Sequence, residues 1–171
     1  ALATALADQV GVAIDNARLF DESEGSRREA ERLAEVGRLL AETLDAALVG
    51  QRIADSAREL LAAQAATVYR LEPGAETLVG LARSGEAGLA IPRDVVLPKG
   101  IGVAGLAVRL ARPVSTSDVL ADPQVELTAD LRAGIEQGSY RSVLGLPLAI
   151  EGRVIGALAI GDRPGRAFSA S

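Results

Sequence analysis

The sequence predicts an α+β domain: an antiparallel β-sheet of about five to six strands, with helices on both faces and a long helix before it. Two observations predict the sheet. Residues 142–150 and 154–160 are apolar runs joined by Glu151-Gly152, the pattern of a β-hairpin. Both runs are apolar at successive positions, whereas a strand with one solvated face alternates, so both faces of the sheet should be covered.

A long helix is predicted over residues 1–45. Its apolar residues have the spacing of a coiled-coil seam, and a second seam that begins at Ala30 is out of phase with the first. The change of phase falls near Gly25, so the segment forms either one helix with a phase break or two helices joined by a short kink. The first seam consists of Leu6, Val10, Ala13, Ala17 and Phe20.

The next segments predict a helix and then a β-hairpin. Apolar residues recur at helical spacing over residues 48–63. Two strand-like runs, residues 66–71 and 77–84, flank Pro73-Gly74, a dipeptide that is typical of turns. The residues expected on the buried side of the helix are Ile53, Ala57, Leu60 and Leu61.

The middle of the chain predicts two short helices with a strand between them. The first helix covers residues 102–110, and a strand follows over residues 113–117. Thr128 is expected to cap the second helix, and Gly138 to end it. The helical side chains expected to face the core are Val103, Leu106, Leu110, Leu131 and Ile135.

Composition excludes several classes of chemistry and partner. The 171 residues include no cysteine and no histidine, which excludes disulfides, thiol nucleophiles, thiolate metal sites and imidazole bases. The net charge is −5 and no basic cluster is present, so nucleic acid is not an expected partner. No apolar run reaches the ~20 residues that span a bilayer, so we expect no membrane contact and a cytoplasmic location. Methionine is also absent, so we expect the chain to be a segment of a longer protein.

Residues 98–119 contain the glycine pattern Gly-x-Gly-x-x-Gly. They lack the Lys-Ser/Thr ending of a P-loop and follow no parallel strand, so neither a P-loop nor a dinucleotide site is expected. We interpret Gly100, Gly102 and Gly105 as residues that allow a tight turn and close packing of a helix on the sheet. Anion binding at the helix N-terminus, beside Lys99, is the alternative interpretation.

Residues 36–171 resemble a GAF domain. The resemblance rests on KGIGVAGLAVRLARPVSTSDV, then YRSVLGLPLAIEGRVIGALAIG, then AFS, in that order. The N-terminal ALATALADQVGVAIDNARLFDE resembles the closing helix of another GAF domain leading into a signalling coiled coil. The positions that match the family pattern are Gly100, Gly102, Gly105, Pro113, Asp118, Ser142, Pro147, Leu148, Gly152, Gly156, Phe168 and Ser169.

This resemblance implies two parts in the chain. Residues 1–45 would be the tail of a preceding GAF domain and a coiled-coil linker, and residues 46–171 a GAF domain without its closing helix. The segment would then come from a tandem-GAF sensor. Residues 1–22 are a candidate to pack in place of the missing closing helix, in their own chain or in a partner chain.

In ligand-binding GAF domains the pocket lies between the sheet and the cover of short helices and loops. The resemblance therefore implies seven candidate residues, in which an arginine beside a tyrosine suits an anionic or planar ligand. Structural roles are the alternative: Asp118 as a turn cap, Tyr140 as a packing aromatic and Arg141 as a solvated side chain. The candidates are Tyr69, Ser115, Ser117, Asp118, Tyr140, Arg141 and Ser142.

The same resemblance limits the cofactors. Bilin attachment and methionine sulfoxide reduction in this family need cysteine, and axial haem ligation by histidine is impossible in this chain, so no haem, bilin or other cofactor is expected. Cyclic-nucleotide-binding members carry an Asn-Lys-x-x-Phe-Asp-Glu-like motif, which this chain lacks. The acidic ADPQVE segment is interpreted as a solvated loop and not as a metal site.

These observations favour a regulatory domain that senses an unknown small molecule in a bacterial-type signalling protein, such as a sensor kinase of a two-component system. The coiled coil would carry the ligand state to an output domain, and the apolar stripe of its helix would form a homodimer. A ligand-free structural dimerisation module is the alternative. Catalysis is not expected, because histidine and cysteine are not available for a nucleophile–base pair, although serine, lysine and aspartate remain.

Overall fold

The computed structural model describes residues 28, 31–36, 45–85 and 95–168. The chain divides into two units, Ala1–Asp45 and Ala46–Ser171. In the first unit, residues 31–36 are helical. The first predicted seam and the phase break near Gly25 lie outside the described residues and stay predictions, as does the proposed role of residues 1–22.

The first helix of the second unit ends at residue 60. Ala62 then takes a left-handed backbone conformation, with φ of 46°, which ends the helix before the predicted residue 63. Gly50 and Ala54 are buried on this helix, and Ile53, Ala57 and Leu61 pack partly buried against the same core. Leu60 is the last residue of the helix. It is 86% exposed, so the prediction that it is buried is wrong.

Six strands form one sheet in the order β3-β2-β1-β6-β5-β4, and every neighbouring pair is antiparallel. The β5–β6 hairpin turns at Glu151 and Gly152, where φ is 51° and 78°. Two positive φ values at these positions are the pattern of a type I′ turn, whose twist matches the strands. The strands are β1 (Ala65–Leu71), β2 (Thr77–Gly85), β3 (Val96–Pro98), β4 (Val114–Thr116), β5 (Ser142–Ile150) and β6 (Arg153–Asp162).

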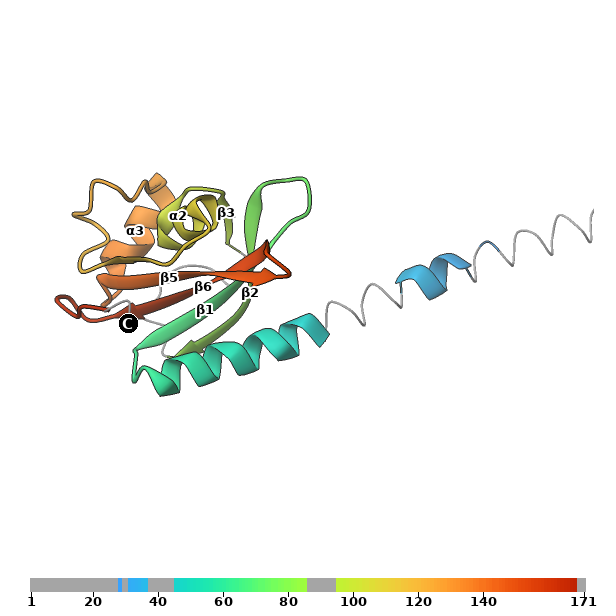
Figure 1. Cartoon of the computed structure of the whole chain (residues 1–171), viewed down its shortest axis with the longest axis horizontal. Coiled ribbons are helices and arrows are strands. Elements are labelled where there is room, and N and C mark those ends of the chain that lie inside the picture. The colour runs from blue at the N-terminus through green and yellow to red at the C-terminus, as the bar shows by residue number, and fades with distance from the viewer. Residues whose placement is uncertain (1–27, 29–30, 37–44, 86–94, 169–171) are drawn as a thin grey trace, which may run out of the picture. The chain divides into compact units, whose positions relative to one another are not determined.

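Helices cover both faces of the sheet, as Figure 1 shows: α2 and α3 lie on one face and the helix over residues 45–60 lies on the other. This confirms the three-layer α+β prediction that was drawn from the apolar character of residues 142–150 and 154–160. Neighbouring residues of β6 divide between the layers, since Ala157 packs under α2 and α3 whereas Leu158 packs under the other helix.

Helix α2 (Gly102–Leu110) has the predicted bounds, and its residues from Gly102 to Val108 are buried. Leu110 is 42% exposed, because it lies in the last turn where α2 leaves the sheet, so its prediction as a core residue is wrong. Helix α3 (Ala129–Gln137) is capped as predicted: the Thr128 hydroxyl accepts a hydrogen bond from the Leu131 amide at 3.2 Å.

Candidate functional site

The glycine pattern at the start of α2 serves backbone geometry. Gly100 and Gly102 have φ of 95° and 68°, values that side-chain-bearing residues rarely adopt. A Cβ on Gly105 would lie 3.0 Å from the Pro98 carbonyl oxygen and 3.0 Å from the Gly100 nitrogen. The interpretation as a tight turn with close packing is confirmed. Lys99 lies outside this packing, with its ammonium 2.7 Å from the Glu76 carboxylate at the surface.

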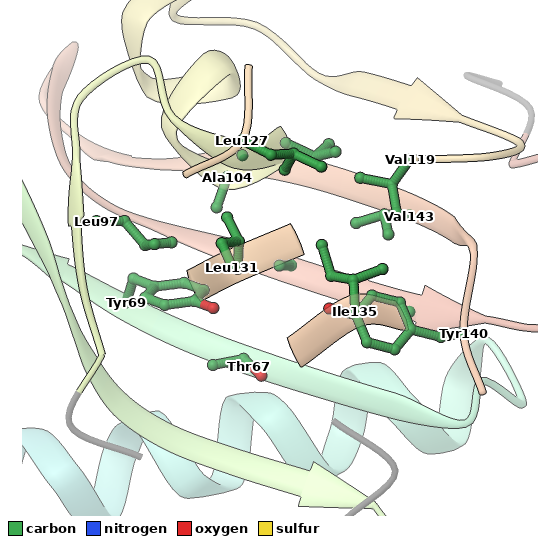
Figure 2. Close-up of a pocket in the computed structure, with 14 residues that line it drawn as sticks. Thr67, Tyr69, Leu97, Ala104, Val119, Leu127, Leu131, Ile135, Tyr140 and Val143 are labelled. Carbon is green, nitrogen blue, oxygen red and sulfur yellow. The ribbon is translucent and has the colours of Figure 1, made fainter. Parts of the chain in front are cut away.

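A cavity of about 50 Å³ lies between the sheet and the layer formed by α2 and α3. Figure 2 shows how α3 side chains and the loop before α3 close the cavity over strand β1. The first turn of α2 forms another part of its wall. The lining residues are Thr67, Tyr69, Leu97, Gly102, Val103, Ala104, Val119, Leu127, Leu131, Ile135, Tyr140, Val143, Ala159 and Gly161.

The polar side chains of the lining are three hydroxyls, those of Thr67, Tyr69 and Tyr140. Tyr69 and Tyr140 are the two tyrosines of the chain, and their exposed fractions are only 4% and 6%. In Figure 2 their hydroxyls point toward one another across the cavity. The Tyr140 ring packs on Gly161, where a Cβ would lie 3.1 Å from a ring carbon, so this glycine makes room for the aromatic side chain.

Burial keeps both tyrosines neutral. It raises the pKa of Tyr69 to about 12, while the charge of Arg83 acts in the opposite direction. Burial also raises the pKa of Tyr140 well above its usual range, and Tyr69 raises it further, while Arg83 and Arg141 lower it. At neutral pH, both side chains therefore present O–H groups that can donate a hydrogen bond.

Alkaline titration should reveal this burial. An unfolded tyrosine ionises near its ordinary pKa of 10.0, whereas Tyr69 in the folded chain ionises near 12. The unfolded state therefore loses protons first, and from pH 10 to 12 Tyr69 alone should lower the free energy of unfolding by about 2–3 kcal/mol. Near-ultraviolet absorbance will report tyrosinate directly, because the chain has no tryptophan. Ionisation of either tyrosine near pH 10 in the folded protein would contradict the burial of that side chain.

Of the seven residues predicted to contact a ligand, the structure brings Tyr69 and Tyr140 to the cavity lining. Ser115 lies on β4 and Ser117 directly follows it. Both side chains are exposed, and neither lines the cavity. Asp118 caps the turn that follows β4, because its carboxylate accepts a hydrogen bond from the Leu120 amide at 3.0 Å. Asp118 therefore has the turn-capping role that was the alternative to contact with a ligand.

Arg141 holds the C-terminal end of α3. Its guanidinium donates to the carbonyl oxygens of Ile135 at 2.8 Å, Gly138 at 3.1 Å and Tyr140 at 2.7 Å. A cation at the C-terminus of a helix also interacts favourably with the helix dipole. Arg141 is therefore half-buried and lies outside the lining; it positions α3 and Tyr140, which both face the cavity.

Ser142 lies on the opposite face of the sheet from the cavity. Its hydroxyl donates to the Thr116 carbonyl oxygen at 3.2 Å and to the Arg166 carbonyl oxygen. The strand alternation explains this placement, since the next residue, Val143, lines the cavity. The hydroxyl fastens the segment after β6 to the start of β5.

Sequence reasoning missed Thr67 as a lining residue and Arg166 as a clamp. Thr67 lies two positions before Tyr69 on β1, so strand alternation alone could have placed both on one face. Arg166 forms an ion pair with the buried Asp162 and donates to the carbonyl oxygens of Leu61 and Ala62. No sequence pattern predicts the contact between Arg166 and Ala62, because the two residues are far apart along the chain.

In the part of the chain that the structure describes, no group of three or more His, Cys, Asp or Glu side chains could hold a metal ion. None of the described helices is long and apolar enough to cross a membrane.

The six-stranded antiparallel sheet, covered by helices on both faces with a small cavity under α2 and α3, defines a three-layer α+β domain. The chain belongs to the GAF domain family, whose model matches residues 31–171. No curated protein sequence matches the chain.

Solved structures share the fold. The GAF domain of a phosphoenolpyruvate-protein phosphotransferase from Coxiella burnetii is 18% identical, with a TM-score of 0.59 over 78% of this chain and 79% of that one. The blue-light-absorbing PixJ GAF domain from Thermosynechococcus elongatus is 23% identical, with a TM-score of 0.59 over 77% of each chain. A type II free methionine-R-sulfoxide reductase from Thermoplasma acidophilum is 25% identical, with a TM-score of 0.57 over 74% of this chain and 81% of that one.

Proposed function

We propose that this GAF domain is a regulatory sensor that binds a small molecule in the cavity between the sheet and α2 and α3. The observation that carries the proposal is the cavity lining. It brings together two deeply buried tyrosines and a threonine whose hydroxyls face an apolar space. A few convergent polar groups in an apolar pocket are typical of ligand sites.

Signal transmission would run through strand β2 to the helix over residues 45–60. Arg83 pairs with Thr67 across the β1–β2 register, so β2 lies next to the cavity lining. On the other face, the Gln51 amide donates to the Arg83 carbonyl oxygen at 2.9 Å, and Arg58 donates to the Ser84 hydroxyl at 2.9 Å. A shift of β2 on ligand binding would directly change these two hydrogen bonds between β2 and the helix.

The parent protein in this proposal is a cytoplasmic bacterial-type signalling protein, such as a two-component sensor kinase, with a homodimer held by the N-terminal helix. The domain itself is proposed to be non-catalytic and to carry no haem or bilin. In support, the chain contains neither histidine nor cysteine, and sulfoxide reduction in this family depends on cysteine. The proposal is supported by two solved structures of this fold, which are named as the GAF domains of a phosphotransferase and of PixJ.

A ligand-free structural module is the second candidate function, and the size of the cavity favours it. The space of about 50 Å³ is far below the roughly 300–1,000 Å³ of pockets for drug-sized ligands. A spacer domain would use the same buried tyrosines for packing only.

Thermal shift with a panel of small metabolites, combined with native mass spectrometry, separates the two candidates. A sensor should retain a ligand or gain several degrees in Tm with at least one compound. Ala159→Val adds two methyl groups to the cavity lining at a strand position that suits a β-branched side chain, and should remove most of that gain. Ala149→Val, at an exposed position of β5, is the matched control. If no compound shifts Tm in the wild-type chain, the sensor proposal fails and the spacer stands.

A further inference from the structure

The polar side chains of the cavity lining are hydroxyls, each of which can donate one hydrogen bond and can also accept. Its lining has hydroxyls from Thr67, Tyr69 and Tyr140 but no acidic side chain. Each of the three residues is more than nine-tenths buried, and within the described part of the chain no hydrogen bond joins their hydroxyls to another residue. A hydroxyl that faces the cavity in this way can donate to an acceptor on a bound molecule.

The first turn of α2 adds further donors to the same wall. Gly102, Val103 and Ala104 all line the cavity, and the N-cap residue Ile101 provides no side-chain cap. The Gly102 amide donates to the Glu126 carbonyl oxygen at 2.8 Å. The amides of Val103 and Ala104 lie before the first i→i−4 bonds of α2, and among the described residues neither donates to a backbone carbonyl outside the helix. The first turn also contains no acidic residue, so its partial positive charge is not offset locally.

Two arginines add positive charge around these donors. Arg83 leaves the sheet on the same face as Thr67, with which it is paired across β1 and β2. Arg141 lies at the end of α3, beside Tyr140. Both arginines have contacts of their own, so they shape the field around the cavity without serving as ligand-binding groups.

The volume sets the size of the occupant. A water molecule needs about 10–15 Å³ measured in this way, so a cavity of about 50 Å³ has room for only a few non-hydrogen atoms. Formate, acetate and nitrate are of this size, whereas a nucleotide or a tetrapyrrole would require the cavity to open widely.

We propose that the cavity binds a small oxyanion, either a short-chain carboxylate or nitrate, through the Tyr69, Tyr140 and Thr67 hydroxyls and the first turn of α2. The inference rests on the proposed sensor function and names the ligand class. Donors without internal acceptors select a ligand that brings acceptor oxygens, and a helix N-terminus selects negative charge.

Isothermal titration calorimetry on the whole chain tests this, with sodium formate, acetate and nitrate as probes at constant ionic strength against chloride. Each oxyanion that fits should bind once per chain, and acetamide, the neutral analogue of acetate, should bind at least about tenfold more weakly. Tyr69→Phe and Tyr140→Phe should each weaken acetate binding about tenfold without loss of Tm. Lys99→Ala, which alters the exposed cation near α2, should leave it unchanged.

Three results would overturn the oxyanion assignment. Acetamide could bind as well as acetate, the two Phe variants could bind acetate like the wild type, or Lys99→Ala could abolish binding. If the oxyanions fail to bind while a larger compound raises Tm in a way that Ala159→Val removes, the ligand class is wrong and the sensor function stands. If neither the oxyanions nor any compound of the panel binds, both proposals fail.

Discussion

Arg166→Ala is expected to lower the free energy of unfolding by about 3 kcal/mol, at the lower end of what loss of a buried ion-pair partner costs. Arg166 pairs with Asp162, whose side chain is only 7% exposed, and the pair is the main charge compensation for that carboxylate. The Asp162 carboxylate otherwise accepts a hydrogen bond from the Arg163 amide at 2.7 Å. Because the Arg166 side chain is itself 33% exposed, water can partly replace it, which keeps the cost below the maximum.

A double-mutant cycle in urea isolates this ion pair. Asp162→Asn combined with Arg166→Ala should cost clearly less than the sum of the two single changes, because the double variant leaves no unpaired buried charge. Arg163→Ala changes an exposed neighbour and is the matched control, with an expected effect within about 0.5 kcal/mol. Additive effects in the cycle would show that the carboxylate does not depend on Arg166.

The consequence of this clamp reaches beyond stability. Arg166 donates to the carbonyl oxygens of Leu61 and Ala62 at the end of the helix over residues 45–60, and its own carbonyl oxygen accepts from Ser142. One residue therefore fastens the segment after β6 both to that helix and to the start of β5. A movement of β5 that accompanies a change in the cavity would therefore change the contacts of Arg166.

The parts of the fold that sequence reasoning predicted correctly are those specified by local patterns. The β5–β6 hairpin follows from two apolar runs around Glu151-Gly152, and the start of α3 follows from the capping residue Thr128. The start of α2 follows from Gly100 and Gly102, whose positive φ values a tight turn requires. In each case, neighbouring residues carry all the information that the element needs.

The candidate site was predicted less completely, because side-chain direction depends on the strand and on distant partners. Tyr140, Arg141 and Ser142 were proposed together, yet successive residues leading into a strand cannot all face one cavity. Tyr140 lines the cavity, Arg141 folds back onto the end of α3, and Ser142 faces the other layer. The Ser142–Arg166 contact joins segments 24 residues apart, which no local pattern can predict.

The packing of α2 on the sheet gives the second large effect. Gly145 of β5 lies directly beneath the first turn of α2, and a Cβ there would be 2.6 Å from the Val103 carbonyl oxygen and 3.0 Å from its carbon. Real Cβ atoms essentially never approach other atoms closer than 3.0 Å, and the obstacle is backbone, which cannot rotate away. Gly145→Ala must therefore lift α2 from β5, and we expect it to destabilise the domain by about 3 kcal/mol.

The same change should alter the cavity, because Val103 and its neighbour Ala104 form part of the lining. Near-ultraviolet circular dichroism should lose intensity, since both tyrosines of the chain face that space. Gly74→Ala is the control: its φ is 78°, but nothing lies within 4 Å of the added Cβ. It should cost only about 1 kcal/mol of backbone strain and leave the tyrosine signal intact. Equal losses of stability in the two variants would mean that α2 does not rest on Gly145.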